Sequence, residues 1–272
     1  MRPVRLRGIS NDHHLDEHDR IEESENFILN GLDHHRISNE LLHLEEAQFN
    51  DYFAKQRVKG IMPRGEFAEV CAQSIRADVL AFKEKIKDYS SPYSESVDFV
   101  VETVQGNIRL FGYMEPLFGD ENQIIEWRFA KYKDRYRIRP WLYYLIQLAT
   151  KENALPPRII AKDKDLTLKT IEKSTALEKL KMYVEAYLQS QQQIQLIPTE
   201  NIAKFIEKDE SAVNFDNVLT NIESLAKTDP YGYRKADPYW ARVLWQTEQF
   251  KSQDGLLQLV KQTTSWFGEM LS

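Results

Sequence analysis

The chain has 272 residues, is 42% hydrophobic and 29% charged, and carries a formal net charge of −6. This length is enough for one large domain or two small ones with a substantial core. The acidic total argues against a protein that coats DNA over its whole surface, because such affinity comes mainly from Lys and Arg. The single cysteine excludes an intrachain disulfide and fits a reducing compartment. No apolar run approaches the roughly 20 residues of a membrane helix, and the N-terminus lacks the apolar core of a signal peptide, so we expect a cytoplasmic protein with no membrane contact.

The N-terminal part of the chain predicts an acidic lead-in followed by two helices. Residues 11–25 carry seven acids and almost no apolar side chains, so we interpret residues 1–24 as a flexible lead-in to a domain that spans 25–272. From Asp33 to about Lys59, apolar residues recur with helical spacing. A second helix is predicted from about Arg64 to the Ser-Ser-Pro sequence that ends at Pro92.

The period of the pattern then changes from 3.6 to 2, which indicates strands. Val97, Phe99 and Val101 alternate with Asp98 and Glu102, and two further strands are predicted at 108–118 and 123–130. Tight turns at 105–107 and 119–122 separate the three. Consecutive strands joined by tight turns predict an antiparallel meander.

The rest of the chain mixes strands and helices. A helix is predicted from about Arg139, with Pro140 in its first turn. Leu155-Pro156-Pro157 marks a possible sub-boundary near 153–157. The overall element order predicts a mixed α/β fold. Beyond this boundary we predict two short strands, at 159–160 and 166–171, and helices at about 174–192, 199–208, 211–227, 237–249 and 254–270.

Three residues of the predicted meander are candidates for a metal-dependent nuclease site. Glu115 closes one strand, and Glu126 and Arg128 lie in the next, where alternation places both on one face and Trp127 on the other. Nucleases of this kind bring two carboxylates to Mg²⁺ beside a cation. Here the first acid is Glu rather than the usual Asp, and the cation is Arg, which does not share a proton usefully. A surface pair of opposite charges therefore competes with residual Mg²⁺-dependent activity.

Two other groups of residues invite a functional interpretation. All the histidines fall within the first 43 residues, but acids surround them and no ligand spacing repeats, so we predict no metal site there. A basic and aromatic stretch follows Trp127, and it is either a DNA-backbone surface or a solvated connector whose aromatics face the core. The histidines are His13, His14, His18, His34, His35 and His43, and the DNA-binding candidates are Arg128, Lys131, Lys133, Arg135, Arg137 and Arg139.

Six stretches in a fixed order carry a family resemblance. They are residues 25–32 with the following helix to Leu42, 62–69, 108–114, 125–128, 141–145 and 237–245. Together they resemble the C-terminal region of the RecC family, the gamma subunit of bacterial exodeoxyribonuclease V (RecBCD), over roughly residues 25–250.

The resemblance implies a degenerate restriction-endonuclease-like core of the PD-(D/E)XK type that does not cleave DNA. It implies a subunit that packs against RecB-type and RecD-type partners, binds DNA and helps to part its strands in double-strand break repair by recombination. It also implies a parent chain about four times longer. No cofactor is expected, and Mg²⁺ only if the vestigial site is active. The active relative has a His on the helix after a Pro-x-Gly motif, whereas the helix after Pro63-Arg64-Gly65 has none. A pure protein-interaction domain without DNA contact is the remaining alternative.

Overall fold

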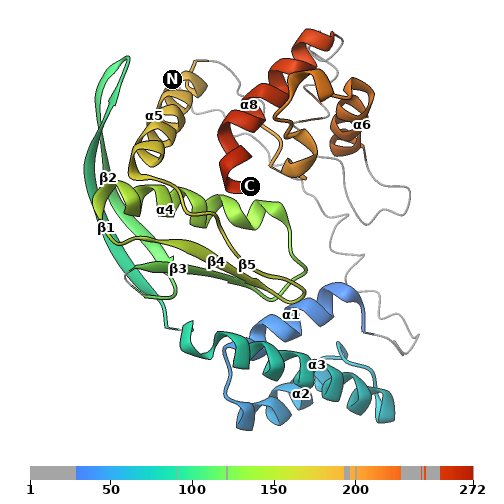
Figure 1. Cartoon of the computed structure of the whole chain (residues 1–272). Coiled ribbons are helices and arrows are strands. Elements are labelled where there is room, and N and C mark those ends of the chain that lie inside the picture. The colour runs from blue at the N-terminus through green and yellow to red at the C-terminus, as the bar shows by residue number, and fades with distance from the viewer. Residues whose placement is uncertain are drawn as a thin grey trace, which may run out of the picture. The chain divides into compact units, whose positions relative to one another are not determined.

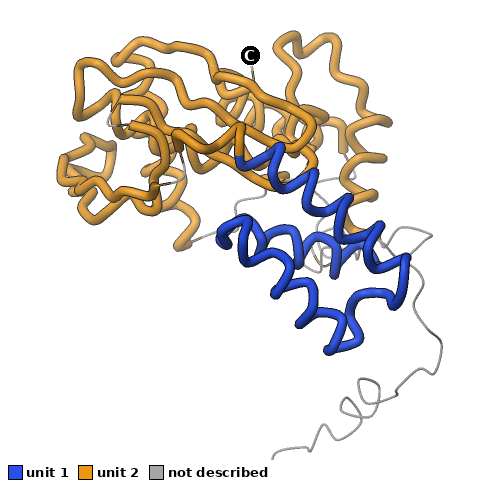
Figure 2. The backbone as a smooth tube through the Cα atoms, turned by 90° about the horizontal axis from the view of Figure 1, so that it is seen from below, with its two compact units in different colours: residues 1–83 blue, residues 84–272 orange. Residues whose placement is uncertain are grey.

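A computed structural model of the chain describes residues 29–89, 91–120, 122–192, 197–199, 201–227, 240, 242 and 252–271. The chain divides into two compact units, Met1–Lys83 and Glu84–Ser272 (Figure 2). The division falls within one helix, α3 (Gly65–Ile86). The boundaries predicted at residue 24 and near 153–157 stay predictions.

Unit 1 is helical. The single helix predicted over 33–59 is wrong, because the structure breaks it into α1 (Gly31–Leu42), a 3₁₀ turn η1 (Glu46–Gln48) and α2 (Phe49–Val58). Glu45 is extended, and its side chain and that of Gln48 cap each other's backbone in a capping box, which starts a new helix. Asn30 caps α1 by accepting a hydrogen bond from the backbone N–H of Asp33 (2.8 Å). The predicted second helix is confirmed by α3, which is followed by the 3₁₀ turn η2 (Lys87–Tyr89).

Unit 2 begins with a long antiparallel hairpin of β1 (Tyr93–Thr103) and β2 (Gly106–Leu117), which curves along one side of the unit (Figure 1). The predicted alternation is confirmed, since exposed and less exposed residues alternate along β1. One face of the hairpin packs against α5 (Lys173–Ser190), and the other faces solvent. The turn lies one residue earlier than predicted, because Gly106, with φ 115°, already belongs to β2.

The predicted three-stranded meander is wrong. β3 (Gln123–Arg128) leaves the hairpin and pairs in parallel with β4 (Leu155–Ala161), whose other edge pairs antiparallel with β5 (Asp165–Thr167). A single bridge between Gly119 and Ile124 is what remains of the predicted pairing. β3 is buried at three consecutive residues, which suits a parallel strand covered on both faces rather than an alternating surface strand.

Helix α4 (Ile138–Thr150) makes the crossover that two parallel strands need. It lies along the β3–β4–β5 sheet (Figure 1) and contacts both β3 and β4. The fully buried side chains of Trp141, Tyr144 and Leu145 place the main core of the unit between α4, β4 and α5. The predicted α4 is therefore confirmed, and its position holds the first turn of the helix against β3.

The C-terminal part is helical but less regular than predicted. α5 and α8 (Gln253–Leu271) confirm two predicted helices, and α6 (Phe215–Ala226) starts four residues later than the predicted 211, where Asn214 caps it. The helix predicted over 199–208 is wrong. Among the described residues of this range only a 3₁₀ turn, η4 (Ile202–Phe205), forms, after Asn201 in the left-handed region (φ 53°), and a second 3₁₀ turn, η5 (Glu210–Ala212), follows. Apart from residues 240 and 242, the helix predicted over 237–249 lies outside the described residues.

The mixed α/β class predicted from the sequence is confirmed by these helices and small sheets. Within the part of the chain that the structure describes, no helix is both long and apolar enough to cross a membrane.

Candidate nucleic-acid interface

Glu126 is the one charged residue among the described residues whose side chain is buried. Its side chain is only 4% exposed, yet it lies on β3 beside two arginines. Nε of Arg128 donates to Oε1 of Glu126 at 2.9 Å, and an Nη atom of Arg139 lies 3.0 Å from Oε2 in an ion pair. Two cations therefore compensate the buried carboxylate, one for each oxygen.

This arrangement corrects the expected surface pair. Glu126 and Arg128 do share a face of β3, as alternation predicts, but the carboxylate is buried rather than solvated. Arg139 comes from the first turn of α4, and the same guanidinium donates to the carbonyl oxygen of Pro116 at 3.0 Å, so it links β2, β3 and α4. From the sequence we predicted that Arg139 contacts DNA. Its ion pair with Glu126 was not predicted, because it forms only when α4 crosses between β3 and β4.

Glu115 lies on the exposed side of β2, immediately before Pro116. The bond from Arg139 to the Pro116 carbonyl brings this end of β2 near Glu126, but an arginine stands there at ion-pair distance from the carboxylate. Among the described residues, no group of three His, Cys, Asp or Glu side chains is placed to hold a metal. His13, His14 and His18 lie outside the described residues.

The basic stretch from Arg128 to Arg139 divides into inward and outward side chains. Arg137 turns inward, where it donates to the Tyr132 hydroxyl and, at 3.0 Å, to the backbone carbonyl of Met270 on α8. Arg128 and Arg139 serve Glu126, as described above. Arg128 is nevertheless exposed, with half of its side chain open to solvent, and the other exposed cations of the stretch are Lys131, Lys133 and Arg135.

A second loop, the β4–β5 turn, lies against this stretch. The backbone N–H of Lys162 donates to the carbonyl of Ala130 at 3.0 Å, and the N–H of Tyr132 donates to Oδ1 of Asp163 at 2.7 Å. The ammonium of Lys164 stands 4.5 Å above the Tyr132 ring. Lys162 and Lys164 of this turn were not among the predicted DNA-binding residues. No local signal in Ala-Lys-Asp-Lys-Asp indicates that the turn contacts the basic stretch.

Tyr132 and Tyr136 are half-buried and pack against the main core. Desolvation by burial is the largest effect on Tyr132 and raises the pKa of its hydroxyl, although Arg137 opposes it. The aromatics of this stretch thus face the core, as the connector interpretation expects, while several of its cations face solvent. The two interpretations left open by the sequence are therefore compatible.

The outer face of the β1–β2 hairpin exposes aromatic side chains. Phe111 is 77% exposed and Tyr113 is 71% exposed. Beside them Arg109 donates two hydrogen bonds of 2.7 Å to the carboxylate of Asp98, and these bonds hold the pKa of Asp98 below its usual value. Val104 is exposed at the turn, so apolar side chains reach the tip of the hairpin.

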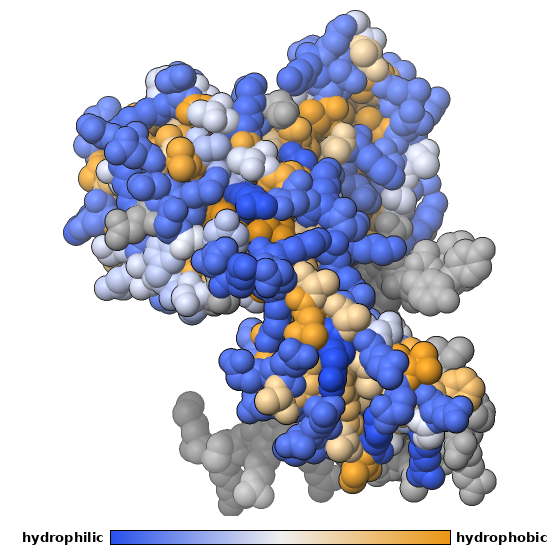
Figure 3. Space-filling view, turned by 60° about the horizontal axis from the view of Figure 1, so that its bottom comes forward, coloured by the Kyte–Doolittle hydropathy of each residue, from blue (hydrophilic) through white to orange (hydrophobic). Residues whose placement is uncertain are grey.

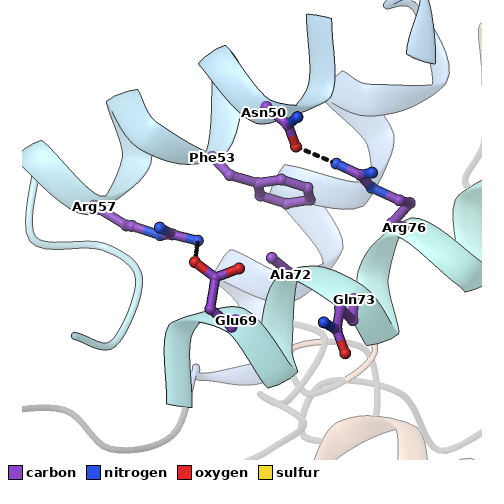
Figure 4. Close-up of a pocket in the computed structure, with 7 residues that line it drawn as sticks. All are labelled: Asn50, Phe53, Arg57, Glu69, Ala72, Gln73 and Arg76. Atoms are coloured by element: carbon purple, nitrogen blue, oxygen red, sulfur yellow. Dashed lines mark hydrogen bonds and ion pairs between the residues drawn. The ribbon is translucent and has the colours of Figure 1, made fainter. Parts of the chain in front are cut away.

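Unit 1 has a cavity of about 300 Å³ between α2 and α3 (Figure 4). An ion pair of 2.8 Å between Arg57 and Glu69 lies at one end, a hydrogen bond between Arg76 and Asn50 lies at the other, and the ring of Phe53 projects between them. Hydrophobic side chains also reach the surface of the helices of this unit (Figure 3), and they include Leu32, Val58, Phe67 and Val70.

Comparison with known proteins agrees with the resemblance seen in the sequence. The family model described as the RecC C-terminal domain matches residues 13–210. The chain is also 50% identical over 258 residues to the RecBCD enzyme subunit RecC of Haemophilus influenzae, an alignment that covers 93% of this chain and 22% of that protein. The chain thus spans about a fifth of the length of this relative. It belongs to the RecC C-terminal domain family.

Proposed function

We propose that this chain is a non-catalytic DNA-binding and scaffolding domain of a RecC-type subunit. It would work in a cytoplasmic bacterial helicase–nuclease complex with RecB-type and RecD-type partners, in double-strand break repair by homologous recombination. Family membership and the name of the Haemophilus influenzae relative, a RecBCD enzyme subunit, support this assignment. The proposal needs no cofactor.

The observation that carries the non-catalytic part is the state of Glu126. A catalytic Mg²⁺ needs carboxylate oxygens that are free to coordinate it. Both oxygens of Glu126 lie within 3.0 Å of a guanidinium nitrogen, so a metal would have to displace Arg128 or Arg139. Arginine stays protonated, and it therefore does not leave such a site by losing its charge.

We further propose that the frame is a degenerate PD-(D/E)XK-type core. The order β1–β2–β3–α4–β4, with β3 and β4 parallel across α4, supports it. So does the position of Glu126 and Arg128 as an acid-x-cation pair in the strand before the crossover helix. The strands of the described residues form two separate sheets, which is consistent with a frame that no longer has to hold a catalytic set.

The test is incubation of the purified chain with linear duplex DNA and Mg²⁺ or Mn²⁺. We expect the DNA to stay intact. DNA loss that disappears in a Glu126→Gln variant, while circular dichroism shows the same fold, would instead identify a residual nuclease and overturn the proposal. A Glu69→Gln variant is the matched control, because it removes an ion-paired carboxylate from unit 1.

Strand separation is proposed for the β1–β2 hairpin. Stacked bases are apolar on their faces, and the exposed ring of Tyr113 can stack on a base at a fork. The ring of Phe111 is 77% exposed, although the guanidinium of Arg109 lies 5.6 Å from its centroid, so it adds apolar surface beside Tyr113. The other tight turn predicted from the sequence, 119–122, does not form the tip of a second paired hairpin, and in it Asp120 accepts two backbone N–H bonds of 2.8 Å.

This role predicts slower unwinding of duplex DNA when a complex with RecB-type and RecD-type subunits carries Phe111→Ser and Tyr113→Ser. Leu177→Ser with Tyr187→Ser is the matched control, because these two side chains are exposed on α5 instead. Equal unwinding rates in both double variants would remove the hairpin from strand separation and leave the scaffolding role intact.

A further inference from the structure

Two loops of unit 2 form one basic surface, which we call the two-loop surface. It consists of residues 131–135, between β3 and α4, and residues 162–164, between β4 and β5. These eight residues carry five cations and two acids, in a chain whose formal net charge is −6. The cations are Lys131, Lys133, Arg135, Lys162 and Lys164.

The two loops are held together by their own acids and backbone. Asp163 accepts the backbone N–H of Tyr132, and Asp134 accepts the hydroxyl of Tyr132 at 3.1 Å. The N–H of Lys162 closes the contact by donating to the carbonyl of Ala130. Both acids of the surface are thus engaged in fixing Tyr132, while Lys131, Lys133 and Lys164 are exposed.

Cations already cover the ring of Tyr132 in this surface and that of Tyr136 next to it. Lys164 lies 4.5 Å and Arg137 lies 5.6 Å from the centroid of the Tyr132 ring. Arg128 and Arg135 lie 5.9 and 6.0 Å from that of Tyr136. A base needs a free ring face in order to stack. These tyrosines, half-buried and covered by cations, hold the positive charges in place instead.

We propose that the two-loop surface binds the sugar–phosphate backbone of DNA through its cations, without reading or stacking bases. The inference rests on the proposed DNA-binding function and narrows it to one site. Two of the DNA-binding candidates predicted from the sequence, Arg137 and Arg139, are left out of this site because their side chains bond within the fold. Lys162 and Lys164 are added to it. Binding is then independent of sequence and strongly dependent on salt.

The test is DNA binding by fluorescence anisotropy with a duplex oligonucleotide of mixed sequence, titrated at several salt concentrations. The variant is Lys131→Gln, Lys133→Gln and Lys164→Gln in one chain. Each lost phosphate contact lowers the slope of log affinity against log salt by about 0.9, so the triple variant loses about 2 to 3. Between 50 and 200 mM salt, wild-type affinity should then fall about 40-fold more than that of the variant.

The matched control removes three exposed lysines elsewhere, as Lys55→Gln, Lys181→Gln and Lys208→Gln, with the same change in net charge. We expect the slope of the control to stay within about 0.5 of the wild-type slope, because its three lysines lie outside the two-loop surface. An effect of net charge alone would instead change the slopes of both triple variants equally. Equal slopes in the two triple variants would overturn the two-loop surface while DNA binding, and so the proposed function, survives. A wild-type chain that does not bind DNA at low salt would overturn both.

A second measurement separates backbone from base contacts. Single strands of equal length are compared, one with thymine bases throughout and one with abasic sites throughout. Backbone binding predicts affinities within about threefold of each other, because both strands carry the same phosphates. A loss of tenfold or more on the abasic strand would show that bases stack on the protein, and would overturn the inference in its stated form.

Discussion

Removing Arg139 should destabilise unit 2 more than removing the charge it pairs with. In Arg139→Met, the buried carboxylate of Glu126 keeps only Arg128, and the carbonyl of Pro116 loses its donor. In Glu126→Gln, by contrast, the two charges left behind are arginines whose side chains are 51% and 36% exposed, so water can solvate them. The asymmetry follows from burial and not from the number of ion pairs.

The magnitudes follow from the same geometry. Leaving a buried charge without any partner costs about 3–5 kcal/mol. Arg128 still meets one oxygen of Glu126 in Arg139→Met, so roughly half of that cost applies, and loss of the hydrogen bond to Pro116 adds about 1 kcal/mol. We therefore expect about 3 kcal/mol for Arg139→Met and about 1 kcal/mol for Glu126→Gln. The double variant should cost less than the sum of the two single costs, because loss of Arg139 leaves no buried charge uncompensated once residue 126 is neutral.

Urea unfolding followed by tryptophan fluorescence is the assay. All five tryptophans lie in unit 2, so their emission reports that unit without a contribution from unit 1. The midpoint shift at constant slope gives the change in the free energy of unfolding. If Glu126→Gln proves as costly as Arg139→Met, or if the two costs add fully in the double variant, the carboxylate is not the group that needs compensation, and our account of this site is wrong.

Two further perturbations test other parts of unit 2. Hydrogen bonds from Arg158 lower the pKa of Asp165, so this acid stabilises the folded state above its unfolded pKa of about 3.9 and loses that contribution as pH falls through the lower folded value. Asp165→Asn should therefore reduce the melting temperature at pH 7, and because the pair is half-exposed the loss of stability should be at most about 1 kcal/mol. The difference between wild type and variant should vanish toward pH 2, and a difference independent of pH would contradict this account. Gly119→Ala should cost about 3 kcal/mol in the urea assay, because Gly119 has φ 104° and a Cβ there would overlap the backbone carbonyl oxygen of Gln123. A cost below about 1 kcal/mol would contradict the turn geometry.

The sequence predicted local features of the fold well and long-range pairing poorly. The alternation of Val97, Phe99 and Val101 identified β1, because a hairpin face that meets solvent imposes period 2. The strand Gln123–Arg128 was placed correctly but paired wrongly. Its consecutive apolar residues Ile124 and Ile125 were a signal of a strand covered on both faces, which favours parallel pairing over a meander.

The candidate site shows the same division. Alternation correctly placed Glu126 and Arg128 on one face of their strand. The ion pair with Arg139 arises only when α4 crosses back over the sheet, and the contribution of Lys162 and Lys164 only when the β4–β5 turn meets the loop after β3. Contacts of this kind depend on tertiary packing, for which one sequence carries no periodic signal.

The parallel pairing of β3 and β4 also sets an order of events during synthesis. In the β1–β2 hairpin, Thr103 pairs with Gly106 across a tight turn, so the hairpin can close in about 1–10 μs once both strands have left the ribosome. β3 must wait, because its partner residues lie beyond the whole of α4. At about 5–20 residues per second, the apolar residues Ile124 and Ile125 stay without their partner strand for seconds. In those seconds the nascent chain presents a short, uncovered apolar strand, and this is the interval in which a chaperone would be most useful to it.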